Sequence, residues 1–280
     1  MKGFLPSLRA IQMFHPRREQ LQDRWSTVGA RVLLKARSGH LLARIFSGVL
    51  HYGQQPSLTE VLANVHIVTD ARAVLSSLRL SVDETDWNQW RVEYCELEKM
   101  LDRRYAECAS LSAPLNWRIE RQTGLLLYAL IRRGRPSVVV EAGVANGHST
   151  VIGLSALQAN AFGELHSFDI SNSIGSLLRD VERARWTLHV YPPWSACTSF
   201  RHLVNELGPV DLFFHDSDHS YIGQFADLLS VWPALGPGAT VVVDDVNEAW
   251  AFFDFAREHH GAAIGLFDSR KLTGVFSTAG

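Results

Sequence analysis

Acidic side chains stand at the ends of four apolar runs that we expect to be β-strands. They are Glu141, Asp169, Asp216 and the adjacent pair Asp244 and Asp245. In open α/β sheets ligands bind at the carboxyl ends of the strands, so these acids are candidates for one common site. Carboxylates that converge repel each other, and a divalent cation resolves that repulsion. Hard oxygen ligands favour Mg²⁺, Mn²⁺ or Ca²⁺ at such a place.

The first acid opens a glycine loop. Val138 to Val140 form a β-branched run, Glu141 ends it, and Gly143 and Gly147 follow before an apolar helical pattern. This order predicts strand, tight loop and helix, with glycines where the backbone approaches a ligand. A dinucleotide fold has a glycine at the position of Glu141, where an anion would repel a pyrophosphate. The loop therefore favours a positively charged nucleoside over NAD, and a plain α/β turn is the simpler alternative.

Asp218 and His219 are titratable side chains that follow Asp216 after the same apolar run, and either could accept a proton. His219 can act near neutral pH because its unperturbed pKa is about 6.5. Asp218 would work only on a hydroxyl that a metal has acidified. We favour His219. In the alternative, Asp218 caps the following helix and Asp245 is an N-cap or a salt-bridge partner.

The glycine loop resembles motif I of the class I S-adenosylmethionine-dependent methyltransferases. The resemblance covers about residues 117–280 and implies a Rossmann-like, mostly parallel sheet that ends in an antiparallel hairpin. It also implies that Asp169 accepts both ribose hydroxyls and that Ser195 lies beside the adenine. The full set of implied cofactor-binding residues is Glu141, Gly143, Asn146, Gly147, Ser149, Asp169, Ser195 and Asp216.

The acids of the last two strands resemble a metal triad. Asp216 is followed 28 and 29 residues later by Asp244 and Asp245. Catechol-type O-methyltransferases have Asp, Asp and Asn at this spacing, so Asp245 replaces an Asn. An Asp-Asp pair also occurs in macrocin-type sugar methyltransferases, and neighbouring runs resemble cephalosporin-hydroxylase-like proteins. The base of these families falls at His219 or Asp218.

The resemblance implies divalent-cation-dependent O-methylation of a small molecule such as a catechol, a sugar diol or a natural-product intermediate. The metal ligands would be Asp216, Asp244 and Asp245, and the catalytic residues His219, Asp218 and Asp216. A metal-independent N-, C- or O-methyltransferase that uses Asp218 or His219 is the first alternative. A non-catalytic protein with the same fold is the second, and a metal-dependent hydrolase is the third.

Hydrophobic patterning predicts the elements that position these residues. We expect strands at 138–141, 165–168, 186–190, 210–214 and 239–243, and a hairpin formed by 262–267 and 272–276. Residues 1–115 are expected to be a helical extension, with Asp70 capping a helix over 71–80 and a long helix over 84–110. We expect residues 116–280 to form the methyltransferase domain, and the extension to be a lid, a substrate element or a contact between identical subunits.

Composition limits the class of protein. The chain has 280 residues, 46% of them hydrophobic, a net charge of −2 and three scattered cysteines. Three cysteines without metal-type spacing predict reduced thiols and a cytoplasmic location. No apolar run approaches the roughly 18 residues of a membrane span. Residues 1–50 hold nine Lys and Arg against two acids. No nucleic-acid-binding motif accompanies this charge, so no nucleic-acid partner is expected.

Overall fold

A computed structural model of the chain describes residues 65–191, 196–249, 251–259 and 263–278. Within these ranges eight strands form one sheet in the order β1-β7-β8-β6-β5-β2-β3-β4. β8 is antiparallel to β6 and β7, and the other pairs are parallel. The strands are β1 (Val65–Val68), β2 (Val138–Ala142), β3 (Glu164–Asp169), β4 (Trp186–Val190), β5 (Val210–His215), β6 (Leu235–Val243), β7 (Ala263–Asp268) and β8 (Lys271–Ser277).

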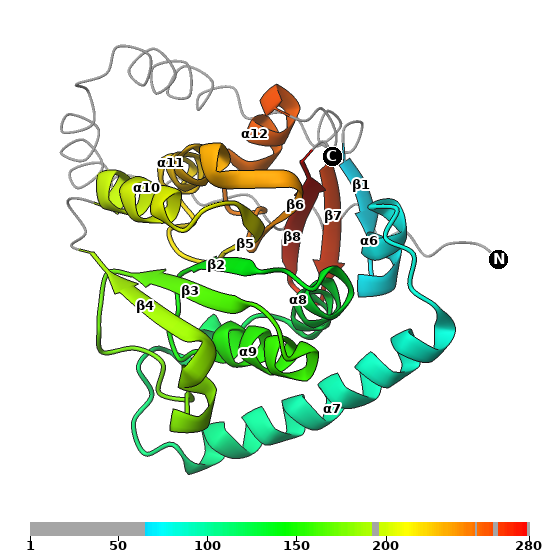
Figure 1. Ribbon diagram of the computed structural model, residues 1–280, viewed down its shortest axis with the longest axis vertical. Coiled ribbons are helices and arrows are strands. Elements are labelled where there is room, and N and C mark those ends of the chain that lie inside the picture. Colours follow the sequence, from blue (N-terminus) through cyan, green and yellow to red (C-terminus); the bar gives the residue numbers. More distant parts are fainter. Residues whose placement is uncertain (1–64, 192–195, 250, 260–262, 279–280) are drawn as a thin grey trace.

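Helices cover both faces of the sheet (Figure 1). The helices of one layer are α6 (Ala71–Ser77), α7 (Glu84–Glu107), α8 (Arg121–Gly134) and α9 (His148–Asn160), and those of the other are α10 (Ala196–Glu206), α11 (Tyr221–Val231) and α12 (Ala251–His259). Each layer packs on its own hydrophobic cluster, because alternate residues of a strand point to opposite faces. All five residues of β2 are buried, as expected for a strand covered on both sides.

The predicted fold class is confirmed, and most predicted strands agree with the structure to within a few residues. The segment 186–190 has the predicted bounds. Asp70 caps α6 as predicted, because its carboxylate accepts a hydrogen bond from the amide of Ala73. The long helix predicted over 84–110 is α7, which ends at Glu107.

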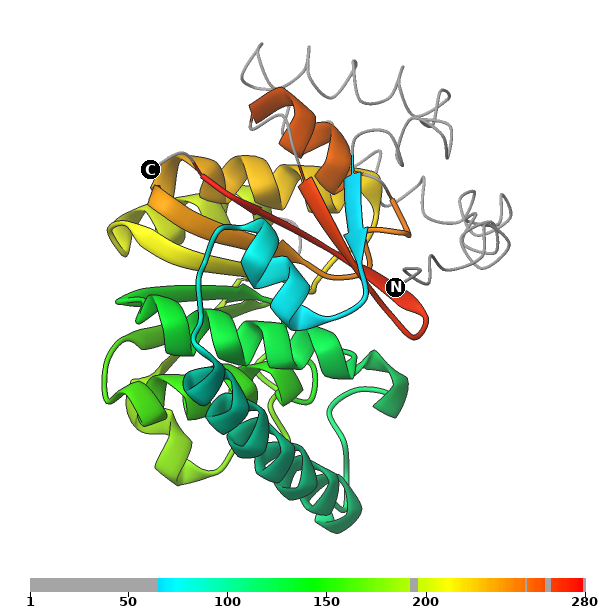
Figure 2. The same ribbon diagram turned by 90° about the vertical axis from the view of Figure 1, so that its right-hand side faces the viewer.

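The prediction that the first 115 residues are helical is wrong at Val65–Val68. This segment is β1, which pairs in parallel with β7 at the edge of the sheet (Figure 2). α6 and α7 pack on the same hydrophobic cluster as α8 and α9 through buried residues such as Leu75, Trp90 and Leu101. The boundary at 115/116 stays a prediction, and residues 1–64 lie outside the described residues. Of the described helices, none has the length and apolar character needed to cross a membrane.

Candidate functional site

The predicted acids meet at the point where the sheet changes its direction of growth. From β2 the chain adds β3 and β4 on one side, and it then returns to add β5 and β6 on the other. Backbone hydrogen bonds continue past the strand ends, from Gly143 N to Phe168 O (2.9 Å) and from Asp216 N to Ala142 O (2.8 Å). Asp244 N likewise donates to His215 O at 2.9 Å. Ligands of open α/β sheets bind at such a crevice.

The glycine loop lies directly against the end of β5. Gly143 has φ +90°, and a Cβ atom there would lie 2.0 Å from the carbonyl oxygen of Asp216. Gly147 has φ +86° and is the residue from which α9 begins. Side-chain-bearing residues rarely adopt such φ values, so both glycines are required by the backbone. The loop fixes the distance between the Glu141 and Asp216 strand ends.

Glu141 is an internal anchor of this loop. Its carboxylate accepts hydrogen bonds from Ser149 Oγ (2.6 Å), Thr150 Oγ1 (2.8 Å) and Ser167 Oγ (2.6 Å), and the residue is 2% exposed. Burial raises the pKa of Glu141, although the three hydroxyl groups oppose that shift. The carboxylate therefore joins β2 to α9 and β3. A direct contact of Glu141 or Ser149 with a cofactor stays a prediction.

Asp169 and Asn146 hold the backbone around the loop. The Asp169 carboxylate accepts hydrogen bonds from the amides of Val144 and Ser171, each at 3.0 Å, and the residue remains partly exposed. Its oxygens keep lone pairs for further donors, and a contact with a ribose stays a prediction. Asn146 is buried and hydrogen-bonded to the backbone of Ala113. Ser195 lies outside the described residues.

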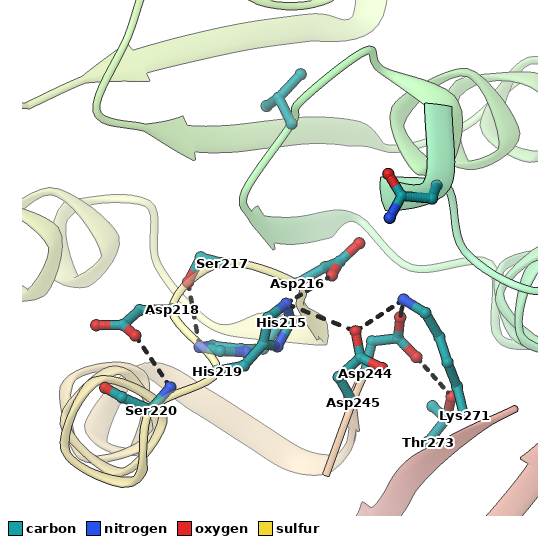
Figure 3. A network of polar contacts seen from close by, with 12 residues as sticks. His215, Asp216, Ser217, Asp218, His219, Ser220, Asp244, Asp245, Lys271 and Thr273 are labelled. Carbon is teal, nitrogen blue, oxygen red and sulfur yellow. Dashed lines mark hydrogen bonds and ion pairs between the residues drawn. The ribbon is translucent and has the colours of Figure 1, made fainter. Parts of the chain in front are cut away.

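Asp216, His219 and Asp245 form a compact group at the ends of β5 and β6 (Figure 3). One potential ligand atom from each residue lies within 4.8 Å of the other two. His219 Nε2 is 3.5 Å from Asp216 Oδ1 and 3.7 Å from Asp245 Oδ2. Asp245 has φ +52°, an uncommon value for a residue with a side chain. The turn after β6 thus aims this carboxylate back toward β5.

Lys271 is a site residue that the sequence-based interpretation missed. Its Nζ atom lies 3.0 Å from Asp244 Oδ2 and 2.7 Å from Asp245 Oδ2 (Figure 3). Asp244 is fully buried, and Thr273 donates to its other oxygen at 2.8 Å. The sequence contained a signal for the position of Lys271. The first residue of an antiparallel strand lies at the edge of the sheet formed by the carboxyl ends of its parallel neighbours. Lys271 follows the predicted hairpin turn and therefore begins at that edge.

Charge and burial have opposing effects on the pKa values of this group. Burial raises the pKa of Asp216 well above its usual range, and the negative charge of Asp244 adds to this effect while Lys271 opposes it. Burial lowers the pKa of His219, with Asp245 acting in the other direction. For Lys271 burial lowers the pKa, but the attraction of Asp244, Asp216 and Asp245 outweighs it and the net shift is upward. The arrangement thus holds a cationic lysine beside a histidine that favours its neutral form.

The two candidates for a base are oriented differently. Asp218 turns toward α11, where it accepts a hydrogen bond from Ser220 N at 3.0 Å and where a Cβ atom on Gly223 would lie 2.3 Å from its Oδ2 (Figure 3). His219 points instead into the group with Asp216 and Asp245. Ser220, rather than Asp218, is the N-cap of α11. The structure therefore orients the two candidate bases differently, whereas the sequence left the choice between them open.

Comparison with known proteins identifies the domain around this site. A family model described as a methyltransferase domain matches residues 140–246, which include the glycine loop and all the acids discussed above. A search of curated proteins found no match.

Solved structures share the fold. The cofactor-bound protein Rv0187 from MTB is 20% identical, with a TM-score of 0.51 over 63% of this chain and 87% of that one. An O-methyltransferase from Bacillus cereus in complex with SAH is 18% identical, with a TM-score of 0.50 over 72% and 93% of the two chains. The SAH-bound methyltransferase PaMTH1 of Podospora anserina is 12% identical, with a TM-score of 0.50 over 71% and 97%.

Proposed function

We propose that this chain is a class I S-adenosylmethionine-dependent methyltransferase and that it methylates a hydroxyl group of a small molecule. The bound cofactor supplies an electrophilic methyl group. The chain must hold the cofactor, orient the hydroxyl and accept its proton. The predicted cofactor residues and the proposed base lie on neighbouring strand ends, which is the arrangement that such a transfer needs.

Asp169 and the glycine loop are the proposed cofactor contacts. Asp169 is partly exposed and fixed by two backbone amides, so its free lone pairs face outward from the end of β3. The binding of SAH by the Bacillus cereus and Podospora anserina proteins, which share this fold, supports the same cofactor here. Asp216, whose backbone meets the loop, would lie between the cofactor and the substrate.

The position of His219 is the observation that carries the proposal. Because burial lowers its pKa, the imidazole is neutral near pH 7 and Nε2 can accept a proton from a hydroxyl group. Asp245 Oδ2, at 3.7 Å from Nε2, would stabilise the imidazolium ion that forms, and Asp216 Oδ1 lies beside the same nitrogen at 3.5 Å. A base with carboxylates on both sides suits a substrate that offers two neighbouring hydroxyls, such as a catechol, a sugar diol or a natural-product intermediate.

The metal expected from the sequence stays a prediction. Asp216 and Asp245 offer oxygen ligands and His219 offers nitrogen, which divalent cations accept in general, but the Asp245 oxygen that faces His219 is also the oxygen that Lys271 contacts. The triad predicted from the sequence does not fit a divalent cation in this arrangement, because Asp244 and Asp245 already hold the ammonium group of Lys271. We therefore base no step of the proposed reaction on a metal.

Two measurements test the proposal. Calorimetric titration of the full chain should detect SAH binding, with NAD as the negative control. Binding of NAD in place of SAH would contradict the proposal. Methyl transfer to a panel of catechols and sugar diols should then identify the acceptor.

A pair of variants tests the base. His219→Gln should lower kcat by about 10²–10⁴-fold, the usual contribution of a general base. SAH affinity should be unchanged, because His219 faces the proposed substrate. Asp218→Asn is the matched control, since this carboxylate faces α11 and should affect kcat little. An equal loss of kcat in both variants would remove His219 from the proposed role.

A further inference from the structure

Lys271 contacts two members, Asp244 and Asp245, of the acidic cluster that Asp216 completes. Its side chain is 6% exposed, and its Nζ atom contacts one carboxylate oxygen of Asp244 and one of Asp245. The second oxygen of Asp244 accepts the hydroxyl of Thr273. Both oxygens of Asp244 are therefore engaged within the protein, and this residue has no exposed surface to offer a metal ion.

The backbone around Lys271 holds this arrangement in place. The turn that follows β6 is bound to the start of β8 twice, from Val246 N to Leu272 O and from Leu272 N to Asn247 Oδ1, each at 2.9 Å. On its other side Lys271 pairs with Asp268 across the β7–β8 hairpin. The backbone of Lys271 is therefore held next to the two acids by contacts on both sides.

A divalent cation and this ammonium group compete for the same oxygens. A Mg²⁺ ion needs oxygen ligands at about 2.0–2.1 Å, and an ion bound to Asp244 and Asp245 would lie within a few ångströms of Nζ. The two positive charges would repel each other in a buried setting where solvent screens poorly. One lysine and one metal ion therefore cannot both use this pair of carboxylates.

We infer that Lys271 is the resident cation of the acidic cluster, in the place where the sequence pattern predicts a divalent metal, and that methyl transfer needs no metal bound to Asp244 and Asp245. The statement about catalysis rests on the proposed function, whereas the statement that Lys271 occupies the cation position does not. Lys271 is then a positioning residue: it holds Asp245 in the orientation that faces His219.

Manganese binding to the full-length chain is the primary test. The wild-type protein should show no saturable Mn²⁺ binding by calorimetry or by electron paramagnetic resonance. Lys271→Gln removes the ammonium group and leaves the acids uncompensated, so this variant should bind Mn²⁺ at least tenfold more tightly than the wild-type protein. Lys99→Gln is the control, because Lys99 is an exposed lysine paired only with Glu96 along α7, and it should not change Mn²⁺ binding.

Each outcome decides the inference. Stoichiometric Mn²⁺ binding by the wild-type chain, or a Lys271→Gln variant that folds and gains no Mn²⁺ affinity, would overturn it. Should Lys271→Gln fail to fold, Lys271→Arg keeps the charge and should remain metal-free, and Mn²⁺ binding by that variant would also overturn the inference. SAH titration of the same samples separates the two proposals, because loss of SAH binding would count against the methyltransferase function and not against the place of Lys271.

Turnover gives a second readout once the acceptor is known. The wild-type rate should be the same in EDTA and in Mg²⁺. A rate that disappears with the chelator and returns with Mg²⁺ would show that the enzyme uses a metal despite Lys271, and would overturn the inference.

Discussion

Asn146 and Ala113 form a reciprocal pair of hydrogen bonds: the amide of Ala113 donates to Asn146 Oδ1, and Asn146 Nδ2 donates to the carbonyl of Ala113, each at 2.9 Å. This pair ties the segment between α7 and α8 to the glycine loop. Ser176 donates to the same Oδ1 atom at 3.2 Å. The side chain of Asn146 thus joins three segments at the glycine loop, because an amide group can both donate and accept hydrogen bonds.

Asn146→Ala should loosen this junction. The variant leaves the amide and carbonyl of Ala113 without their partner, which should lower the free energy of unfolding by about 1–3 kcal/mol. Hydrogen exchange should accelerate at residues 112–113 and in the glycine loop. Asn88→Ala, which alters an exposed side chain on α7, is the control and should change neither quantity. Unchanged exchange at 112–113 would show that the segment is held elsewhere.

Gly143→Ala should disrupt the meeting of β2 and β5. The new Cβ atom would lie 2.0 Å from the Asp216 carbonyl oxygen, at a residue whose φ is +90°. Left-handed backbone alone costs a residue with a side chain about 1–2 kcal/mol, and the clash adds to this. We expect a loss of more than about 2 kcal/mol in urea unfolding and a large loss of SAH affinity.

Gly134→Ala is the matched control for that change. Gly134 is the last residue of α8, and a Cβ atom there meets nothing within 4 Å. Alanine should stabilise this position by up to about 1 kcal/mol because it reduces the freedom of the unfolded chain. Similar destabilisation by both substitutions would mean that Gly143 has no special backbone role.

The strands that carry the site were predictable from the sequence because each is a short apolar run that ends in an acid. The acids Asp169 and Asp216 therefore lie where the pattern indicated. β1 was not predictable in the same way. Val65–Val68 is four residues long and precedes two helices, and its partner β7 lies nearly 200 residues later, so local pattern alone contains no sign of their pairing.

The acids of the site were predictable as a set, but the spacing of the acids does not identify their partners. Convergence of carboxylates follows from strand order, and it indicates only that a positive charge is needed. A metal and a lysine both satisfy that need. Lys271 is set beside Asp244 and Asp245 by the antiparallel pairing of β8 with β6, a long-range relationship that spacing between the acids does not contain. The orientations of Asp218 and His219 likewise depend on the first turn of α11.

Asp169→Ala should weaken SAH binding by about 1.5–3 kcal/mol, roughly a tenfold to hundredfold increase in Kd, because a charged acceptor for the ribose hydroxyls is lost. Asp211→Ala is the control for the loss of an acid that accepts backbone amides. Asp211 Oδ2 accepts from Ser137 N (2.7 Å) and Val138 N (3.0 Å) at the opposite end of β2. The Asp211→Ala variant should lower the free energy of unfolding. It should leave the Kd of SAH unchanged at a temperature where both variants are folded. Equal Kd changes in the two variants would argue against a ribose contact by Asp169.

Glu141→Gln should make stability less sensitive to pH. Burial raises the pKa of Glu141 above its ordinary value of 4.5, so the folded protein holds the proton more tightly than the unfolded chain does. Below pH 4.5 both states are protonated and the carboxyl imposes no penalty. As pH rises through the raised pKa, the unfolded chain ionises more readily and the folded state loses stability. The glutamine variant has no such titration, so the difference in unfolding free energy between variant and wild type should shift in favour of the variant as pH rises from 4 to 8.

Urea unfolding from pH 4 to 8 measures this difference in unfolding free energy, with Glu248→Gln, which alters an exposed carboxylate, as the control. A difference that stays flat or moves the other way would show that Ser149, Thr150 and Ser167 stabilise the ionised carboxylate enough to cancel the effect of burial.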